Sequence, residues 1–207
     1  QRFVSEVGAQ LASRSHRPHL RWSFAVVDSP TVNAFAAPGG FIYVTRGLLA
    51  HLGSEAELAG VLGHEIGHVT ARHAAEQYTR STSSQLGLAL GSILFPEVRP
   101  YANLAGTGLG LLALRYGRQD EIEADRLGAE YAAQAGWDPS GIEGMLRTLA
   151  RLGEASTDRR GVPNWLSTHP DPAQRVEEIA PVVARLQPPA GAEVRRGRGA
   201  YLQRHDG

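Results

Sequence analysis

A continuous helical pattern that begins near Ser54 places the strongest constraint on the fold. Ser54 followed by Glu57 is the signature of a capping box, which starts a helix. Apolar residues then recur at the three- and four-residue spacing of a helix with one buried face, namely Leu58, Val61, Leu62, Ile66 and Val69. The pattern therefore predicts a long helix that carries the stretch GHEIGHVTARH, residues 63–73.

Two histidines of this stretch stand one helical turn apart. Positions i and i+4 lie on one face of a helix, so His64 and His68 can offer two imidazoles to one ion. Glu65 projects about 100° round from His64, where a base for a bound water belongs. HExxH on a helix is typical of zinc peptidases. The alternative is a solvated polar helix face in which histidine recurs.

His73 tests whether the motif is longer. The extended motif HExxHxxGxxH requires glycine at position 71 and histidine at position 74, but the chain has Ala71 and Ala74. On a continuing helix, His73 is rotated away from the metal face, which predicts a surface or packing histidine. A third ligand must then come from elsewhere in the chain.

A second acidic stretch, DEIEADRLG, supplies that candidate ligand. Catalytic zinc commonly has three protein ligands and an open position for water. Glu121 and Asp125 form another i, i+4 pair, so Glu121 is predicted to bind the metal. Asp125 is predicted to accept a hydrogen bond from the other nitrogen of a zinc histidine, whereas Glu123 projects elsewhere. The alternative is an acidic first turn that only complements the helix dipole.

Composition favours one globular domain and restricts the ligand types. The chain has 207 residues, of which 42% are hydrophobic and 20% charged, enough for a single core. Its 21 basic residues balance 21 acidic ones, so no net field favours nucleic acid, and no such partner is expected. The absence of cysteine leaves histidine and carboxylate as metal ligands. Because it opens with Gln1 and shows no leader pattern, the chain is expected to be a mature or trimmed fragment.

The remaining patterns predict an α+β fold that is mostly helical. They indicate a helix in 2–15, strands in 22–30 and 39–47 with an irregular link, and helices from Asp120 to about Ala135, in 138–153 and in 173–186. Segments 86–95 and 104–114 are apolar but too short to span a bilayer of ~30 Å, so buried helices are expected and no transmembrane segment. Residues 1–186 are the expected domain, and 187–207 a tail or linker toward a missing C-terminal region.

Four sequence blocks occur in a characteristic order. They are VNAFAAPGGFIYVTRGLL, ELAGVLGHEIGHVTARH, EIEADRLGAEY and STHPDPAQRVEEI. Together they resemble the gluzincin peptidase family that includes the HtpX heat-shock protease, the CAAX prenyl endoprotease and periplasmic BepA-like proteases. The resemblance implies a zincin-like metallopeptidase domain with a small β-sheet and an active-site HExxH helix. Because no transmembrane segment is expected here, the soluble periplasmic branch is the closer likeness, which implies a periplasmic or membrane-associated location.

The resemblance also implies a role for each matching residue. His64, His68 and Glu121 become the ligands of one Zn²⁺, with Glu65 as the general base and Asp125 behind the ligands. His169, in STHPDP, would occupy the fourth zinc position or stabilise the oxyanion. Arg175 matches an arginine that follows this histidine in the family; otherwise it is a surface charge or a salt-bridge partner. The predicted edge strand for substrate consists of Gly40, Phe41, Ile42, Tyr43 and Val44.

The implied activity is zinc-dependent hydrolysis of peptide bonds in extended or misfolded envelope proteins. Glu65 would take a proton from water and pass it to the leaving amine. Binding by β-augmentation would demand little of the substrate's sequence. Self-inhibition by His169, or by residues 79–117 lying over the site, is also implied, with core packing as the alternative for that segment.

Two other classes of function are compatible with the sequence. One is a zinc-containing chaperone or adaptor with latent or no peptidase activity. Glu65 favours the enzyme, because a structural zinc site needs no unligated carboxylate beside it. The other is a membrane-surface protein that uses the glycine-rich apolar segments.

Overall fold

The computed structural model describes residues 1–77, 79, 116–155, 164–187 and 194–197. The predicted helices in 86–95 and 104–114 lie outside these residues, as does nearly all of segment 79–117. The described elements, in chain order, are α1 (Arg2–Ala12), β1 (Ser23–Val27), β2 (Ala34–Ala37), β3 (Phe41–Thr45), α2 (Arg46–Leu49), α3 (Glu55–Ala71), α5 (Arg118–Gln134), α6 (Gly141–Ala155), α7 (Asn164–Thr168) and α8 (Pro172–Val183). One small sheet among many helices confirms the predicted α+β class.

The three strands form one mixed sheet with the order β1-β3-β2. Strand β1 pairs in parallel with β3, and β2 pairs antiparallel with β3. The tight connection from β2 to β3 passes through Gly39 and Gly40, whose φ angles of 100° and 98° favour glycine. Strand β2 lies in the link that the sequence pattern treats as irregular, because its residues AFAA do not alternate in polarity.

The prediction of an edge strand in residues 40–44 is wrong. Strand β3 lies in the centre of the sheet and uses its backbone groups on both sides. The residues concerned are Gly40, which precedes the strand, and Phe41, Ile42, Tyr43 and Val44 within it. Among the described strands, the two edges are β1 and β2, so an added chain has access to those strands rather than to β3.

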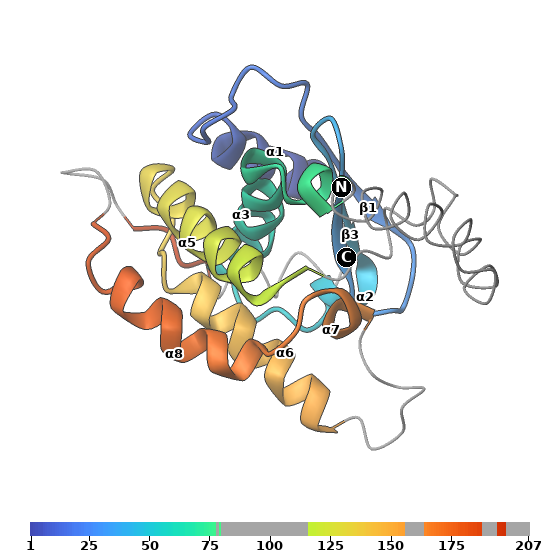
Figure 1. Ribbon diagram of the computed structural model, residues 1–207, viewed down its shortest axis with the longest axis vertical. Helices are drawn as coiled ribbons and strands as arrows, with labels where there is room; N and C mark the ends of the chain where they lie inside the picture. The colour runs from blue at the N-terminus through green and yellow to red at the C-terminus, as the bar shows by residue number, and fades with distance from the viewer. Residues whose placement is uncertain (78, 80–115, 156–163, 188–193, 198–207) are drawn as a thin grey trace, which may run out of the picture.

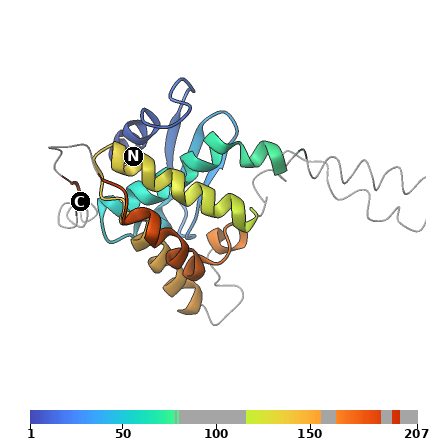
Figure 2. The same cartoon turned by 60° about the vertical axis from the view of Figure 1, so that its left-hand side comes forward.

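Helix α3 lies in the middle of the domain. Figures 1 and 2 show the sheet and α1 on one side of α3, with α6 and α8 on the other side and α5 running beside it. The largest fully buried apolar side chains come from α1, the sheet, α3 and α6 and include Leu11, Ile42, Leu58, Leu62, Ile66, Met145 and Leu146. The core thus surrounds α3 and holds the HExxH stretch inside the protein.

Three glycines let α3 and α5 pack backbone against backbone. A Cβ atom on Gly67 would lie 2.8 Å from the carbonyl oxygen of Ala124, and one on Gly128 would lie 2.7 Å from the amide nitrogen of His64. Gly63 makes the same kind of approach, at 2.8 Å from the Gly128 oxygen. Any larger residue would push these helices apart. The close approach brings the acidic stretch of α5 against the histidines of α3.

Helix α3 begins as predicted but ends at Ala71, before the end of the stretch 63–73 that it is predicted to carry. The Ser54 hydroxyl accepts a hydrogen bond from the Glu57 amide, while the Glu57 carboxylate accepts one from Gly53 rather than from Ser54. At the other end Arg72 adopts the left-handed conformation, with φ 65°, and residues 73–77 are helical again. This turn redirects the chain just before His73.

Part of the predicted tail packs on the domain. The Arg195 amide donates to the Gly136 carbonyl at 3.0 Å, and the Asp138 amide donates to the Arg195 carbonyl at 3.1 Å. The Arg195 guanidinium also lies 4.1 Å from the centre of the Trp137 ring. Residues 194–197 are therefore held against the end of α5. Within the described ranges, we find no helix with the length and apolarity that crossing a bilayer requires.

Candidate metal centre

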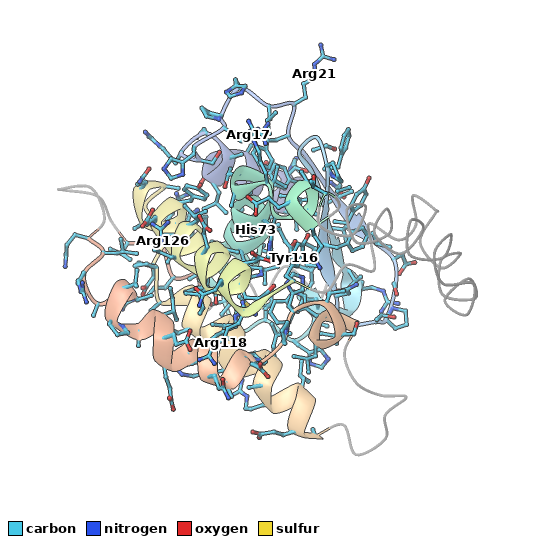
Figure 3. The ribbon with its side chains drawn as sticks, viewed as in Figure 1. Arg17, Arg21, His73, Tyr116, Arg118 and Arg126 are labelled. Carbon is cyan, nitrogen blue, oxygen red and sulfur yellow. The ribbon has the colours of Figure 1, made fainter. Side chains whose placement is uncertain are left out.

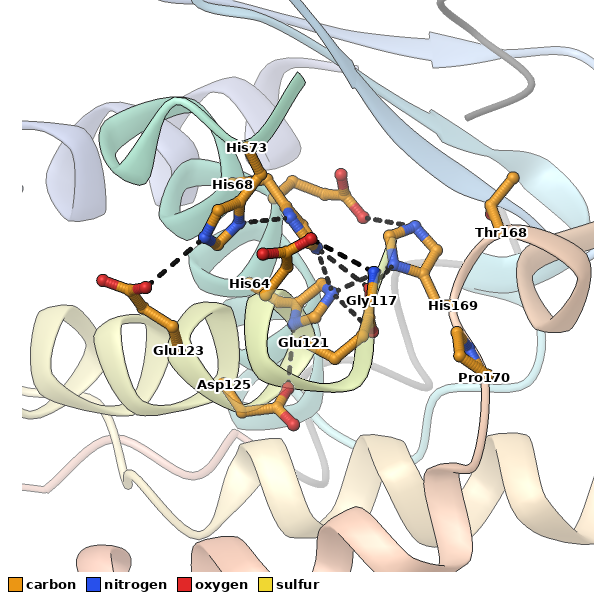
Figure 4. A network of polar contacts seen from close by, with 12 residues as sticks. His64, His68, His73, Gly117, Glu121, Glu123, Asp125, Thr168, His169 and Pro170 are labelled. Atoms are coloured by element: carbon orange, nitrogen blue, oxygen red, sulfur yellow. Dashed lines mark hydrogen bonds and ion pairs between the residues drawn. The ribbon is translucent and has the colours of Figure 1, made fainter. Parts of the chain in front are cut away.

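Four side chains from three parts of the chain converge on one point. The Nε2 atoms of His64 and His68, on α3, are 3.0 Å apart. Glu121, on α5, places its two carboxylate oxygens 3.6 Å and 3.4 Å from these nitrogens. His169, which follows α7, places Nδ1 2.9 Å from Glu121 and 3.3 Å from His64 (Figure 4). All four residues are buried, and one ligand atom from each lies within 4.8 Å of the others.

Three of these five separations, 3.3, 3.4 and 3.6 Å, match the spacing of ligand atoms around a tetrahedral metal ion, and the other two, 2.9 and 3.0 Å, are shorter. Zinc bound to nitrogen or carboxylate oxygen at about 2.0–2.2 Å holds its ligand atoms about 3.3–3.6 Å apart. The Nδ1 atom of His64 faces the Asp125 carboxylate at 2.8 Å, so it carries the proton and the Nε2 lone pair faces the cluster. Three imidazole nitrogens and a carboxylate oxygen are ligands that suit zinc and related divalent ions. The site therefore has the donors and the spacing for a metal.

A buried arginine joins the two carboxylates of α5. Arg175 donates from Nε and Nη2 to the two oxygens of Asp125, at 2.7 Å and 2.6 Å, and from Nη1 to Glu121. Its exposed fraction is 2%, so the alternative of a surface charge is wrong. Burial by itself would raise the pKa of Asp125, but Arg175 and His64 together outweigh burial and lower it. Burial opposes ionisation of Glu121 too, yet His169 and Arg175 hold its pKa well below the ordinary value. Both carboxylates are therefore ionised.

Glu65 lies beside the cluster but is not one of the converging ligands. Its exposed fraction is 1%, and neither carboxylate oxygen accepts a hydrogen bond of ordinary geometry from the described residues. The His169 Nε2 atom is 3.8 Å away, and Trp165 is a polar neighbour that favours the charged form. Burial dominates and raises the pKa of Glu65. A buried carboxylate with a raised pKa is a group poised to take a proton.

Two aromatic rings that the sequence patterns do not indicate hold the cluster histidines. Tyr116 stacks on His68 with ring centres 3.9 Å apart, and Trp165 stacks on His169 at 4.5 Å. Burial and the neighbouring His64 lower the pKa of His68 well below its ordinary value. Burial also opposes the charged form of His169, but the adjacent Glu121 carboxylate raises its pKa overall. The rings restrict rotation of both imidazoles, and His68 is kept in the neutral form that metals bind.

His73 contacts the cluster, contrary to the prediction from helical rotation. Its Nδ1 atom lies 2.9 Å from Nδ1 of His68, and its Nε2 atom lies 3.5 Å from the Glu123 carboxylate. The rotation argument fails because it assumes that the helix continues, whereas Arg72 turns the chain back toward His68. His73 is nevertheless a buried packing residue outside the converging ligands, which is one of the two predicted roles. Glu123 also lies outside these ligands, as predicted, and its half-exposed carboxylate faces His73 instead. Figure 3 shows His73 near Tyr116, and their ring centres are 6.3 Å apart.

A cavity adjoins the cluster at the edge of the sheet. Its volume is about 340 Å³, and it lies between β2, the turn that follows β2, and the C-terminal part of α3. Its walls include Ala36, Ala37, Pro38, His68, Arg72 and Tyr116. Because His68 belongs to both the cluster and the cavity wall, β2 is the strand edge from which an extended chain would reach the candidate metal centre.

Comparison with known proteins gives one consistent result. The sequence profile described as "Peptidase family M48" matches residues 1–182. The chain is 40% identical over 170 residues to "Mitochondrial metalloendopeptidase OMA1" of Arabidopsis thaliana, an alignment that covers 82% of this chain and 33% of the relative. It is 32% identical over 196 residues to "Beta-barrel assembly-enhancing protease" of Escherichia coli (strain K12), with coverages of 90% and 39%. The chain thus spans about a third to two fifths of the length of these two relatives.

Proposed function

Because this chain belongs to peptidase family M48, we propose that it is the catalytic domain of a zinc-dependent endopeptidase. The observation that carries the proposal is Glu65, a buried carboxylate beside four converging ligands that accepts no hydrogen bond of ordinary geometry from the described residues. A structural metal site gains nothing from such a group, since an unpaired buried carboxylate reduces stability. A peptidase needs it as the base.

Each residue of the site has a proposed role. His64, His68 and Glu121 hold the zinc ion, which when bound activates a water molecule and polarises the scissile carbonyl. Glu65 takes a proton and passes it to the leaving amine. Asp125, fixed by Arg175, accepts a hydrogen bond from Nδ1 of His64 and so directs the Nε2 atom of His64 toward the cluster.

His169 is the proposed self-inhibitory residue. Its Nδ1 atom lies within the ligand cluster, and its Nε2 atom faces the Glu65 carboxylate. In this position the ring would supply a fourth ligand to a bound metal ion in place of water, and it lies against the proposed base, Glu65. Rotation of His169 away from the cluster would open the site, and from there a donor nitrogen could stabilise the oxyanion. Segment 79–117, the other candidate for self-inhibition, lies almost entirely outside the described residues.

We propose that the substrates are extended or misfolded polypeptides that pair with β2. Among the described strands β2 forms an edge of the sheet, which adjoins the cavity that leads to His68, and such pairing relies on the backbone of the substrate. We propose a location in the periplasm or on the periplasmic side of a membrane, on the support of the alignment of 90% of this chain with "Beta-barrel assembly-enhancing protease" of Escherichia coli (strain K12). We also propose that residues 1–186 form the peptidase domain, which the family match over residues 1–182 supports.

Metal analysis combined with a peptidase assay tests the proposed function. We expect close to one zinc per wild-type chain, cleavage of an unfolded protein such as reduced casein, and loss of both in His64→Ala and Glu121→Ala. Glu65→Gln should keep its zinc, and its turnover number should fall about 10²–10⁴-fold. The exposed His51→Ala variant is the matched control and should behave as wild type. Full activity in Glu65→Gln would exclude Glu65 as the base. If the zinc-loaded wild type and His169→Ala both prevented aggregation of an unfolded protein without cleaving it, the chaperone would be favoured.

Replacing His169 tests the proposed self-inhibition. We expect His169→Ala to bind zinc and to show a higher initial rate than the wild type, because the fourth position and Glu65 both become accessible. The measurement is the initial rate on a fluorogenic peptide at equal zinc content. A decrease in kcat without a change in KM would instead assign His169 to the oxyanion.

A further inference from the structure

We propose that His73, backed by Glu123, is the positioning residue for His68. In this arrangement an acceptor at Nδ1 of His73 fixes the tautomer and the ring direction of His68, so that Nε2 of His68 faces the metal. The proposal rests on the zinc site proposed above. It adds two residues, outside the HExxH motif and the four-residue cluster, that determine how well this site holds its metal.

The two nitrogens of His68 face different partners. Its Nε2 atom lies 3.0 Å from His64 and 3.4 Å from Glu121, inside the cluster. Its Nδ1 atom lies 2.9 Å from Nδ1 of His73, on the opposite side of the ring. His73 is itself buried, with 3% of its surface exposed, and therefore shields this contact from solvent (Figure 4).

The direction of each hydrogen bond follows from the valence of imidazole. A neutral imidazole has one N–H and one lone pair, so a His68 that gives its Nε2 lone pair to a metal carries its proton on Nδ1. That proton is donated to Nδ1 of His73, which must be the acceptor. The proton of His73 is then on Nε2, the atom that faces the Glu123 carboxylate at 3.5 Å. Glu123 thus favours the tautomer of His73 that supports His68.

The two histidine ligands are held by different kinds of partner. His64 donates to Asp125, a fully buried carboxylate that Arg175 holds with two hydrogen bonds. His68 donates to a neutral ring whose supporting carboxylate, Glu123, is 51% exposed. Both arrangements keep the ligand histidine in the metal-binding tautomer, and loss of such an outer partner typically weakens metal affinity about 10–100-fold.

Two features of the fold bring His73 and Glu123 to the Nδ1 side of His68. Arg72 takes the left-handed conformation, an uncommon one for a residue with a side chain, and returns the chain toward the cluster. Helix α5, which packs closely on α3, then brings Glu123 within reach of the same ring. A residue that only fills space could be replaced by any side chain of similar size. A positioning residue must keep an acceptor at the place of Nδ1.

The test compares two replacements of His73 that differ in this acceptor. In His73→Asn the amide oxygen can occupy the place of Nδ1, whereas His73→Leu has a similar size and no acceptor. Zinc affinity is measured by competition with a chromogenic chelator, and the ligand geometry by the visible absorption spectrum of the Co²⁺-loaded protein. We expect His73→Leu to lose about 10–100-fold in zinc affinity and to alter the cobalt spectrum. His73→Asn should recover most of the affinity and the wild-type spectrum, and Glu123→Gln should lose less than His73→Leu.

The controls separate positioning from packing and from the proposed function. The Tm of each metal-free variant reports packing alone, and His51→Ala serves as a remote histidine control. Wild-type affinity in both His73 variants would overturn the inference while leaving the zinc peptidase intact. Equal losses in both, in proportion to a lower metal-free Tm, would also overturn it and leave only packing. A wild-type chain that binds no zinc would overturn the inference together with the proposed function.

Discussion

Glu65 illustrates at the residue scale how a candidate catalytic group opposes stability. Its carboxylate is buried beside Glu121, another acid, and lacks hydrogen bonds from the described residues. Removing an ionised group from water without a partner costs free energy of folding. Natural sequences retain such groups where activity requires them. Glu65 is therefore the position at which stability and the proposed chemistry should conflict most directly.

We predict that Glu65→Gln stabilises the metal-free protein in a pH-dependent way. Burial raises the pKa of Glu65 in the folded state above its ordinary value of 4.5. Below pH 4.5 the carboxyl group is protonated in both the folded and the unfolded protein, so burying it costs no charge-related free energy of folding. As the pH rises from 4.5 through the folded pKa, the cost grows and then remains constant. The gain in Tm of the variant should thus be small at pH 4 and correspond to about 1–3 kcal/mol at pH 7.

Thermal denaturation of chelator-treated protein at both pH values measures this effect. Glu154→Gln, at an exposed position on α6, is the matched control and should leave Tm unchanged. If Glu65→Gln gave the same gain at pH 4 and pH 7, the stabilisation would come from packing of the amide rather than from removal of a charge.

The contact between α3 and α5 is the main determinant of the site at the scale of elements. Helix α3 carries His64 and His68, and helix α5 carries Glu121 and Asp125. Glycines at the contact let the two backbones lie too close together for a methyl group to fit between them. The ligands can meet only while the helices keep this distance. Substitution of an interface glycine therefore tests whether helix packing and metal binding are coupled.

We predict that Gly67→Ala weakens both folding and zinc binding. The added methyl group would lie 2.8 Å from the Ala124 carbonyl oxygen, so the helices must separate, at a cost of about 1–3 kcal/mol. The higher helix propensity of alanine offsets about 1 kcal/mol of that loss. Chemical denaturation and chelator competition would measure the two effects. Gly117→Ala, whose methyl group would meet only the Asp120 side chain at 3.5 Å, should change neither by a comparable amount.

At the scale of the whole molecule the cluster connects distant parts of the chain. His64 and Glu121 come from two helices, and His169 comes from the segment between α7 and α8. Arg175 adds α8 to the same network through Asp125 and Glu121. A metal bound here joins these parts in the folded state only. Its binding free energy therefore adds to the stability of the whole domain.

We predict that zinc removal lowers the Tm of the wild-type protein. The stabilisation amounts to about 4 kcal/mol when free zinc exceeds its Kd a thousandfold. Calorimetry with and without a chelator measures the difference. The His64→Ala variant should show no chelator effect, because it lacks a ligand. An unchanged wild-type Tm after complete metal removal would show that the cluster does not link folding to metal binding.

The sequence by itself determined the parts of the site that lie within one helix. The spacing of His64 and His68, and that of Glu121 and Asp125, places each pair on one face because the helical period is fixed locally. The same period predicted the helices around the core, and together with two β-rich runs it predicted the α+β class. Tertiary structure decided the rest: the order of the strands, the edge position of β2, and the meeting of His73 with His68 and Glu123. These depend on a left-handed turn at Arg72 and on contacts between residues far apart in the chain, for which helical spacing carries no information.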